Sequence, residues 1–136
     1  MSRSDPARGF TLIELLIVMF IMSISLSLVL PLTVDQVDKA KQRSERQLVV
    51  LFYKNAVQQA FFGSQTIKLK FLGKVLSYGE AERRREIRFE QLSFREAEIT
   101  VTVPGVIPAQ RVEVAIDGRI WVLELDKDEA NWFNPD

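Results

Sequence analysis

The sequence predicts an α+β protein in which one long N-terminal helix packs on a C-terminal antiparallel β-sheet. Three observations lead to this fold class. Residues 10–32 form an apolar run without a basic residue or a glycine, and residues 33–62 contain neither proline nor glycine. After Gly63, apolar and polar residues alternate in several segments. A change from helical spacing to period-two spacing is typical of a passage from helix to strands.

Residues 10–32 are predicted to span a membrane. At about 1.5 Å per residue in a helix, a run of this length covers the ~30 Å hydrocarbon core of a bilayer. The preceding residues are polar and include Arg3 and Arg8, and positive charge beside a span keeps that end in the cytoplasm. The rest of the chain is therefore expected outside the cytoplasm. Residues 29–32 contain no small-residue cleavage site of the secretory type, so an uncleaved signal anchor is one interpretation of this run.

A single acid, Glu14, lies near the start of the apolar run. An ionised side chain at the bilayer centre costs about 2.5–3.5 kcal/mol on insertion scales, unless it only reaches toward the headgroups, so a partner charge is expected. If the chain is cut between Gly9 and Phe10, the new α-amino group of a neighbouring subunit supplies that partner. An acid and an amine attract strongly at low dielectric, and a mismatched stagger leaves a buried charge unpaired. The pair is therefore expected to set the register of packed spans.

The sequence GFTLIE at residues 9–14, followed by the apolar run, resembles the class III signal of type IV pilins and of the pseudopilins of type II secretion. The resemblance implies that a prepilin peptidase cuts after Gly9 and methylates the new N-terminal amine of Phe10. It also implies that Glu14 is the acid that pairs between subunits, and that Pro31 kinks or loosens the long helix. The family has the architecture of a long helix followed by an antiparallel sheet, the pilin-like roll.

Four parts are predicted along the chain. Residues 1–9 are a cytoplasmic leader that is cleaved, residues 10–32 a transmembrane or filament-core helix, residues 33–63 an amphipathic helix, and residues 64–136 an antiparallel β domain with a polar C-terminal tail. Apolar residues of the amphipathic part recur mostly every three or four residues, which predicts packing against the sheet. They include Val34, Val37, Leu48, Leu51, Phe52, Ala56 and Phe62. Gly63 is expected to end the helix.

The β domain is predicted from alternating segments and one turn signal. The predicted strands cover residues 66–71, 74–78, 86–90, 98–103, 111–116 and 120–125. Asp117-Gly118 stands between the last two of them, and Asp-Gly between alternating segments is a strong signal for a two-residue hairpin.

Composition excludes several classes of function. The chain has no cysteine and no histidine, which excludes thiolate- or His-ligated zinc, disulfides, and Ser-His or Cys-His catalytic pairs. Its acids and lysines are scattered over solvent-facing strand positions and form no catalytic set, so neither an enzymatic activity nor a cofactor is expected. The formal net charge is zero, which argues against nucleic acid as a partner.

Two basic segments are candidate contact surfaces. Residues 39–46 suit lipid headgroups or adjacent subunits, although a solvated helix face is the simpler interpretation for most of them. Arg83-Arg84-Arg85 suits an acidic partner, and the simpler interpretation is a loop or strand edge that charge keeps soluble.

The C-terminal segment offers two further candidates. Residues 126–131 are rich in oxygen ligands but fit a calcium loop poorly, because Ala130 takes a ligand position and Asn131 the glycine position. A polar tail is favoured there, and no metal site is predicted. Trp132 and Phe133 either fold back onto the core or meet a partner subunit.

Together with the resemblance, these features indicate a minor pseudopilin that assembles into the pseudopilus of a type II secretion system. Residues 43–71 resemble the H-type minor pseudopilins, and an Asp-Gly hairpin near the end recurs there. The cysteine pair of many major pilins and the calcium loop of the major pseudopilin have no counterpart in the sequence. The expected partners are other pseudopilin or pilin subunits, the prepilin peptidase and the inner-membrane assembly platform. The expected location is the bacterial inner membrane, with the C-terminal domain in the periplasm.

Two alternative functions stay open at the level of sequence. A minor pilin of a type IV pilus, or a competence pseudopilin, has a similar organisation. A membrane-anchored binding module held by a single span is the second alternative, and it predicts an intact leader and tolerance of Glu14→Ala. A membrane-tethered enzyme requires a deep pocket with paired acids, for which the sequence gives no indication.

Overall fold

The computed structural model describes residues 9–103, 106–127 and 129–135, without the side chains of residues 30–32 and 106–108. Most of the predicted leader, the Pro31 side chain and Asp128 of the acidic segment thus lie outside the described residues. The chain divides into two compact units, Met1–Val37 and Asp38–Asp136.

Helix α1 runs from Leu12 to Gly63 and contains 52 residues. Its backbone is helical through residues 30–32, although a proline removes one backbone N–H group and crowds the preceding turn. The prediction that the helix continues past Pro31 is confirmed. Within the first unit, every described side chain from Leu12 to Val29 is exposed.

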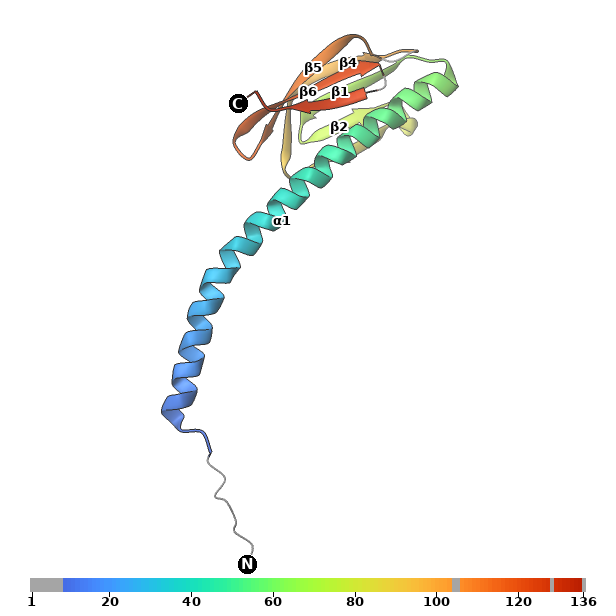
Figure 1. The fold of residues 1–136 in the computed structure, drawn as a ribbon. Coiled ribbons are helices and arrows are strands. Elements are labelled where there is room, and N and C mark those ends of the chain that lie inside the picture. Colours follow the sequence, from blue (N-terminus) through green and yellow to red (C-terminus); the bar gives the residue numbers. More distant parts are fainter. Residues whose placement is uncertain (1–8, 104–105, 128, 136) are drawn as a thin grey trace, which may run out of the picture. The chain divides into compact units, whose positions relative to one another are not determined.

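In the second unit, α1 buries one face against the sheet. Val49, Tyr53, Ala56 and Ala60 are buried and recur at intervals of four, three and four residues, which places them on one side of a helix. They share a single hydrophobic core with residues of the strands, and Figure 1 shows this part of α1 alongside the strands. The Tyr53 hydroxyl also donates a 2.5 Å hydrogen bond to the carbonyl of Lys127.

The predicted apolar stripe of α1 is wrong in part. Five residues of the stripe were expected to pack against the sheet but have exposed side chains: Val34, Val37, Leu48, Leu51 and Phe62. The buried face includes two alanines, Ala56 and Ala60, whose small side chains let the helix backbone approach the strands closely. Leu48, Leu51 and Phe62 form a second apolar face of this half of α1 that the sheet does not cover.

The end of α1 is closed by backbone hydrogen bonds. The N–H of Gln65 donates to the carbonyl of Ala60 at 3.1 Å, and the N–H of Ser64 donates to the carbonyl of Phe61 at 3.3 Å. This is the Schellman arrangement, in which the residue after the helix adopts a left-handed conformation. The helix ends at Gly63 as predicted, but the left-handed residue is Ser64, with a φ of 47°.

The strands that follow form one antiparallel sheet. They are β1 (Ile67–Gly73), β2 (Val75–Tyr78), β3 (Arg85–Arg88), β4 (Leu92–Val101), β5 (Val106–Ile116), β6 (Arg119–Lys127) and β7 (Glu129–Phe133), with a short 3₁₀ helix η1 (Ala81–Arg83) before β3. Among the described residues the strand order is β3-β2-β1-β4-β5-β6-β7, and every neighbouring pair is antiparallel.

Alternation along the strands places the core on one face of the sheet. In β1, Ile67, Leu69 and Phe71 are buried while Lys68 and Lys70 are exposed. The period of two turns successive side chains to opposite faces, so the apolar set meets α1 and the lysines meet solvent. The predicted fold class, a long helix packed on an antiparallel sheet, is confirmed.

The predicted Asp-Gly hairpin is confirmed between β5 and β6. Ile116 pairs with Arg119, which leaves Asp117 and Gly118 as the two turn residues. Both have positive φ, 51° and 71°, as a type I′ turn requires.

Residues 129–131 differ from the prediction, which placed them in a polar tail, and Trp132 and Phe133 follow them in the same element. They form strand β7 and pair with β6. Ala130 and Trp132 pack against the core, whereas Glu129, Asn131 and Phe133 are exposed. Two inward apolar side chains among polar neighbours are enough to hold a short edge strand, although the overall composition is that of a solvated tail.

Candidate functional site

The predicted cleavage position precedes the first turn of α1. Gly9, Phe10 and Thr11 are not helical, and the helix begins at Leu12. The Thr11 side chain caps it, because its Oγ1 accepts a 3.3 Å hydrogen bond from the N–H of Glu14. A threonine in this position satisfies one of the N–H groups that a helix start leaves unpaired. The Gly9–Phe10 bond therefore lies in non-helical backbone, two residues before the helix.

Glu14 lies in the first turn of α1. Its side chain is exposed, and its carboxylate has no hydrogen bond or ion pair with any described residue. An acid in a first turn is favoured by the positive end of the helix macrodipole. The spacing Thr-x-x-Glu is that of a capping box, a signal in the sequence that predicts the helix start without any partner subunit. The interaction of Glu14 with the helix macrodipole uses no hydrogen bond of its carboxylate. The same carboxylate can therefore also pair with a group of a neighbouring subunit.

The segment after Glu14 exposes large apolar side chains on all sides. Side chains that are about half exposed or more include Leu15, Leu16, Ile17, Met19, Phe20, Ile21, Met22, Leu26 and Leu28. The helix is long and apolar enough to cross a membrane. Water is a poor solvent for such a surface, so this half of α1 requires lipid or the apolar surface of neighbouring chains.

Three serines interrupt the apolar surface without leaving polar groups unpaired. The hydroxyls of Ser23, Ser25 and Ser27 donate to the backbone carbonyls four residues earlier, at 2.8, 2.9 and 2.9 Å. An unpaired hydroxyl is costly in hydrocarbon, and bonding back to the helix removes most of that cost. The serines are therefore compatible with a lipid-facing or helix-facing position.

The sequence comparison bears directly on this segment. Residues 5–30 match the family model described as the prokaryotic N-terminal methylation motif. This match supports a type IV pilin-like protein. The prepilin-type motif contains Gly9, Phe10 and Glu14 and ends before Pro31. It implies processing by a prepilin peptidase and assembly with other pilin subunits, and together with the single apolar helix it fits a membrane-anchored protein. No significant match was found among curated proteins or among solved structures.

The basic segment 39–46 makes contacts within the head, the unit that begins at Asp38. Both carboxylate oxygens of Glu45 accept backbone N–H groups: Oε1 from Glu90 at 2.8 Å, and Oε2 from Gln91 at 2.9 Å and Leu92 at 3.1 Å. Lys41 forms a 2.9 Å ion pair with Glu90. The hydrogen bond between them raises the pKa of Lys41 and lowers the pKa of Glu90. These side chains join α1 to the loop between β3 and β4.

Arg46, in the same segment, stacks on the sheet. Its guanidinium lies 4.6 Å from the centre of the Trp121 ring, a cation–π contact. Lys41, Glu45 and Arg46 thus have an intramolecular role that neither sequence interpretation of this segment contained.

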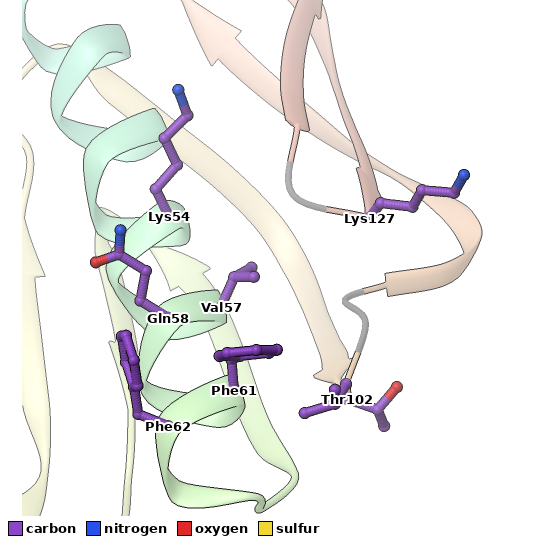
Figure 2. Close-up of a pocket in the computed structure, with 8 residues that line it drawn as sticks. Lys54, Val57, Gln58, Phe61, Phe62, Thr102 and Lys127 are labelled. Atoms are coloured by element: carbon purple, nitrogen blue, oxygen red, sulfur yellow. The ribbon is translucent and has the colours of Figure 1, made fainter.

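An open groove lies beside the last turns of α1. It has a volume of about 610 Å³ and is lined by Lys54, Val57, Gln58, Phe61, Phe62, Thr102, Val103 and Lys127. Figure 2 shows Phe61 on the side of the helix that faces Thr102, with Lys127 across the groove. Phe62 is 83% exposed and Phe61 63%, so two aromatic rings at the end of the helix lack a cover. The sequence interpretation assigned Phe62 to the stripe that faces the sheet and did not use Phe61, although the adjacent phenylalanines before Gly63 are the signal for this surface.

The C-terminal candidates are placed by β7. Trp132 lies against the core, which confirms the first alternative for this residue, and Phe133 is 50% exposed on the opposite face, so a contact of Phe133 with a partner subunit stays a prediction. The buried Nε1 of Trp132 has no acceptor among the described residues. Over the described part of the chain, no group of three or more acidic side chains is placed to hold a metal ion.

Proposed function

We propose that this chain is a minor pseudopilin, a type IV pilin-like subunit that enters the pseudopilus of a type II secretion system and supports protein export. The observation that carries the proposal is the prepilin-type motif at residues 5–30. It coincides with the start of a helix whose surface from Leu12 to Val29 is apolar except for one acid and a few hydroxyls. In this proposal residues 10–32 are held in the inner membrane, and the head lies in the periplasm.

Processing creates the charge that Glu14 requires. The prepilin peptidase cuts after Gly9, in the non-helical backbone before α1, and methylates the amine of Phe10. A methylated amine is still a cation and still donates a hydrogen bond. In the isolated chain the Glu14 carboxylate has no partner among the described residues, so it is available to the amine of a neighbouring subunit.

The pair of Glu14 and the Phe10 amine sets the register between subunits. An apolar surface packs in many staggers with similar energy, because contact between aliphatic side chains is not directional. A buried carboxylate without its amine costs several kcal/mol, so staggers that leave it unpaired are rejected. Unprocessed chains lack the amine, and they are excluded from the filament for the same reason.

The apolar half of α1 allows the subunit to move from a lipid environment into the protein environment of a filament. Its exposed aliphatic side chains find an equivalent apolar environment in the bilayer and among the packed spans of a filament. The assembly platform therefore needs to supply little energy to transfer this surface. The second apolar face of α1, which includes Leu48 and Leu51, offers contact area to neighbouring subunits outside the membrane.

Two sequence features support a minor rather than a major subunit. The chain has no cysteine pair, and its acidic segment at residues 126–131 departs from a calcium loop. Resemblance over residues 43–71 favours the H-type subunits of type II secretion over minor pilins of type IV pili and competence pseudopilins.

The proposal is tested by the mass of the N-terminal peptide from membrane-extracted protein, combined with co-purification of the filament. We expect a peptide that begins at methylated Phe10. Glu14→Ala should be processed normally but recovered with the filament at about one tenth of the normal level or less, because it leaves a neighbour's amine buried and unpaired, which costs about 3–5 kcal/mol.

Glu96→Ala is the matched control, since it removes an exposed carboxylate of the head and should leave both readouts unchanged. An intact leader beginning at Met1 or Ser2 would refute the proposal and leave the membrane-anchored binding module. If subunits of a type IV pilus co-purify instead of subunits of a type II system, the protein is a pilus subunit and not a pseudopilus subunit. The role proposed for Glu14 stays the same in that case.

A further inference from the structure

The two outer strands of the sheet have free edges. β3 pairs with β2 on one side, and β7 pairs with β6 on one side; no described residue pairs with the other side of either strand. The outer N–H and C=O groups of such strands are a template for a further strand, and short length and charge are the usual protections. β3 and β7 are short, so charge decides whether their edges attract or repel a partner.

The two edges carry opposite charge. Residues 82–88, around β3, contain four arginines and two glutamates, a net charge of +2. Residues 126–133, around β7, contain three acids and one lysine, a net charge of −2. Arg84 forms a 3.4 Å ion pair with Glu86, but Arg83, Arg85 and Arg88 have no ion pair with any described residue. The same holds for the acids Asp126 and Glu129.

The acids at β7 repel each other, and a cation beside them would remove this repulsion. Asp126 and Glu129 stand directly opposite each other in the register of β6 and β7, and like charges in this position destabilise a strand pair. Because no described side chain neutralises them, the sheet retains this repulsion in the single chain. An arginine from another molecule would remove it.

The directions of the edge strands allow repeated contact. Six antiparallel steps separate β3 from β7 in the sheet order, so the two strands run in the same direction. When two sheets lie side by side in one orientation, β7 of one and β3 of the next form a parallel pair. Such a contact joins two different surfaces and leaves one β3 edge and one β7 edge free at the two ends of the assembly. This geometry gives an open row of molecules rather than a closed dimer.

We propose that the β7 edge of one copy docks on the β3 edge of a second copy of this chain, with Arg88, on the outward face of β3, and the positive charge around it attracting Asp126 and Glu129. The proposal deepens the filament function and rests on it for the common orientation of the subunits. Phe133, half exposed on the outward face of β7, adds apolar area to the contact. A pair of copies is sufficient, so the contact is compatible with a minor subunit.

The absence of cysteine from the chain makes the contact measurable by cross-linking. Glu86 on β3 and Asn131 on β7 both alternate with core-packed residues and therefore face outward. Full-length Glu86→Cys and Asn131→Cys proteins are purified in detergent, mixed, and treated with a short bifunctional thiol reagent. We expect the mixture to give cross-linked dimer at several times the level of either variant alone, and the double variant to give a ladder of higher oligomers.

Charge reversal tests the stated partners. Asp126→Arg with Glu129→Arg in the Asn131→Cys protein should reduce the dimer at least fivefold. When this protein is mixed with a Glu86→Cys protein that also carries Arg83→Glu and Arg88→Glu, the dimer should be restored. Raising the salt concentration to about 0.5 M should weaken the normal contact, because ions screen exposed charges. Near-ultraviolet circular dichroism of the two tryptophans checks that each variant is folded.

Thr100→Cys, exposed on the central strand β4, is the matched control and should give no dimer with Asn131→Cys. The proposal is overturned if the Glu86→Cys and Asn131→Cys mixture gives no more dimer than the single variants, or if charge reversal leaves the dimer unchanged. The first result would mean that the arginines only prevent the β3 edge from pairing with another strand. Neither result affects cleavage after Gly9, because this experiment needs neither the peptidase nor the filament.

Discussion

Glu45 is the residue whose loss should most weaken the attachment of α1 to the sheet. Its carboxylate accepts three backbone N–H groups from residues 90–92, and no other described side chain replaces it there. Glu45→Ala leaves these donors unpaired in a partly buried loop, which should lower the free energy of unfolding by about 1–3 kcal/mol. Urea unfolding of the full chain in detergent, followed by tryptophan fluorescence, measures the change.

Glu113→Ala is the comparison for this variant. Glu113 forms a 2.9 Å ion pair with Arg95, and both side chains are more than half exposed. Exposed pairs contribute little, so the free energy of unfolding should change by less than about 1 kcal/mol. Equal effects of the two substitutions would show that the three hydrogen bonds to Glu45 do not hold the loop.

The ion pair between Lys41 and Glu90 should make a small contribution to stability that depends on pH. Glu90 has its pKa lowered from 4.5 by the hydrogen bond to Lys41, so its contribution is present above about pH 4.5 and is lost as the pH falls through the lowered pKa. Lys41 has its pKa raised from 10.5 by the same bond, so its contribution is present below about pH 10.5 and is lost as the pH rises through the raised value.

Lys41→Met isolates this contribution. The difference in urea midpoint between the normal chain and the variant should be constant between about pH 6 and pH 9 and should shrink toward acid and toward alkali. It should also shrink in high salt, because both groups are exposed. A difference that does not vary with pH would assign the effect of the variant to packing instead of charge.

Features near the N-terminus were open to prediction from sequence because their signals are local. Glu14 stands out as the single acid in residues 10–32, and the Thr11 cap follows from a spacing of three residues. The roles of Glu45 and Arg46 were not predictable in this way. Their partners, residues 90–92 and Trp121, are more than 40 residues distant in the sequence, and only the packed fold brings them together.

At the scale of elements, the end of α1 offers a substitution that should stabilise the protein. Ser64 has a φ of 47°, a left-handed conformation that costs a residue with a side chain roughly 1 kcal/mol and glycine very little. Ser64→Gly should therefore raise the free energy of unfolding by about 0.5–1 kcal/mol. Gly63→Ala is the contrasting variant and should bring no such gain, because an added Cβ would lie 3.1–3.3 Å from the Gln65 side chain. A loss of stability in Ser64→Gly would contradict this account.

Element prediction succeeded where one period dominates a segment. The alternation in β1 and the Asp-Gly turn after β5 are strong local signals, and both are confirmed. It failed for β7, whose two inward side chains lie among polar residues, and for Leu48 and Leu51 on α1. In a helix with apolar residues on two sides, spacing does not tell which side meets the sheet. Here the choice depends on Ala56 and Ala60, which allow close approach.

At the scale of the whole molecule, the two units expose different kinds of surface. The unit that ends at Val37 exposes aliphatic side chains throughout its described helix, and so its conformation depends on lipid or on neighbouring chains. The unit that begins at Asp38 contains every residue of the hydrophobic core, from Val49 to Leu125. The hydrophobic core and the apolar surface long enough to span a membrane thus belong to separate parts of the chain.

This division predicts that the fragment Asp38–Asp136 folds without the apolar half of α1. Its 99 residues are close to the usual size of a single-core domain, and the removed segment contributes no residue to the core. We expect a single cooperative urea transition with native near-ultraviolet circular dichroism from Trp121 and Trp132, and a midpoint close to that of the full chain in detergent. In the fragment, Tyr53→Ala should lower the free energy of unfolding by about 3–5 kcal/mol, whereas Leu51→Ala, on the uncovered face, should change it by less than about 1 kcal/mol. A fragment that unfolds gradually, or that responds equally to both variants, would show that the head depends on the membrane-spanning half for its fold.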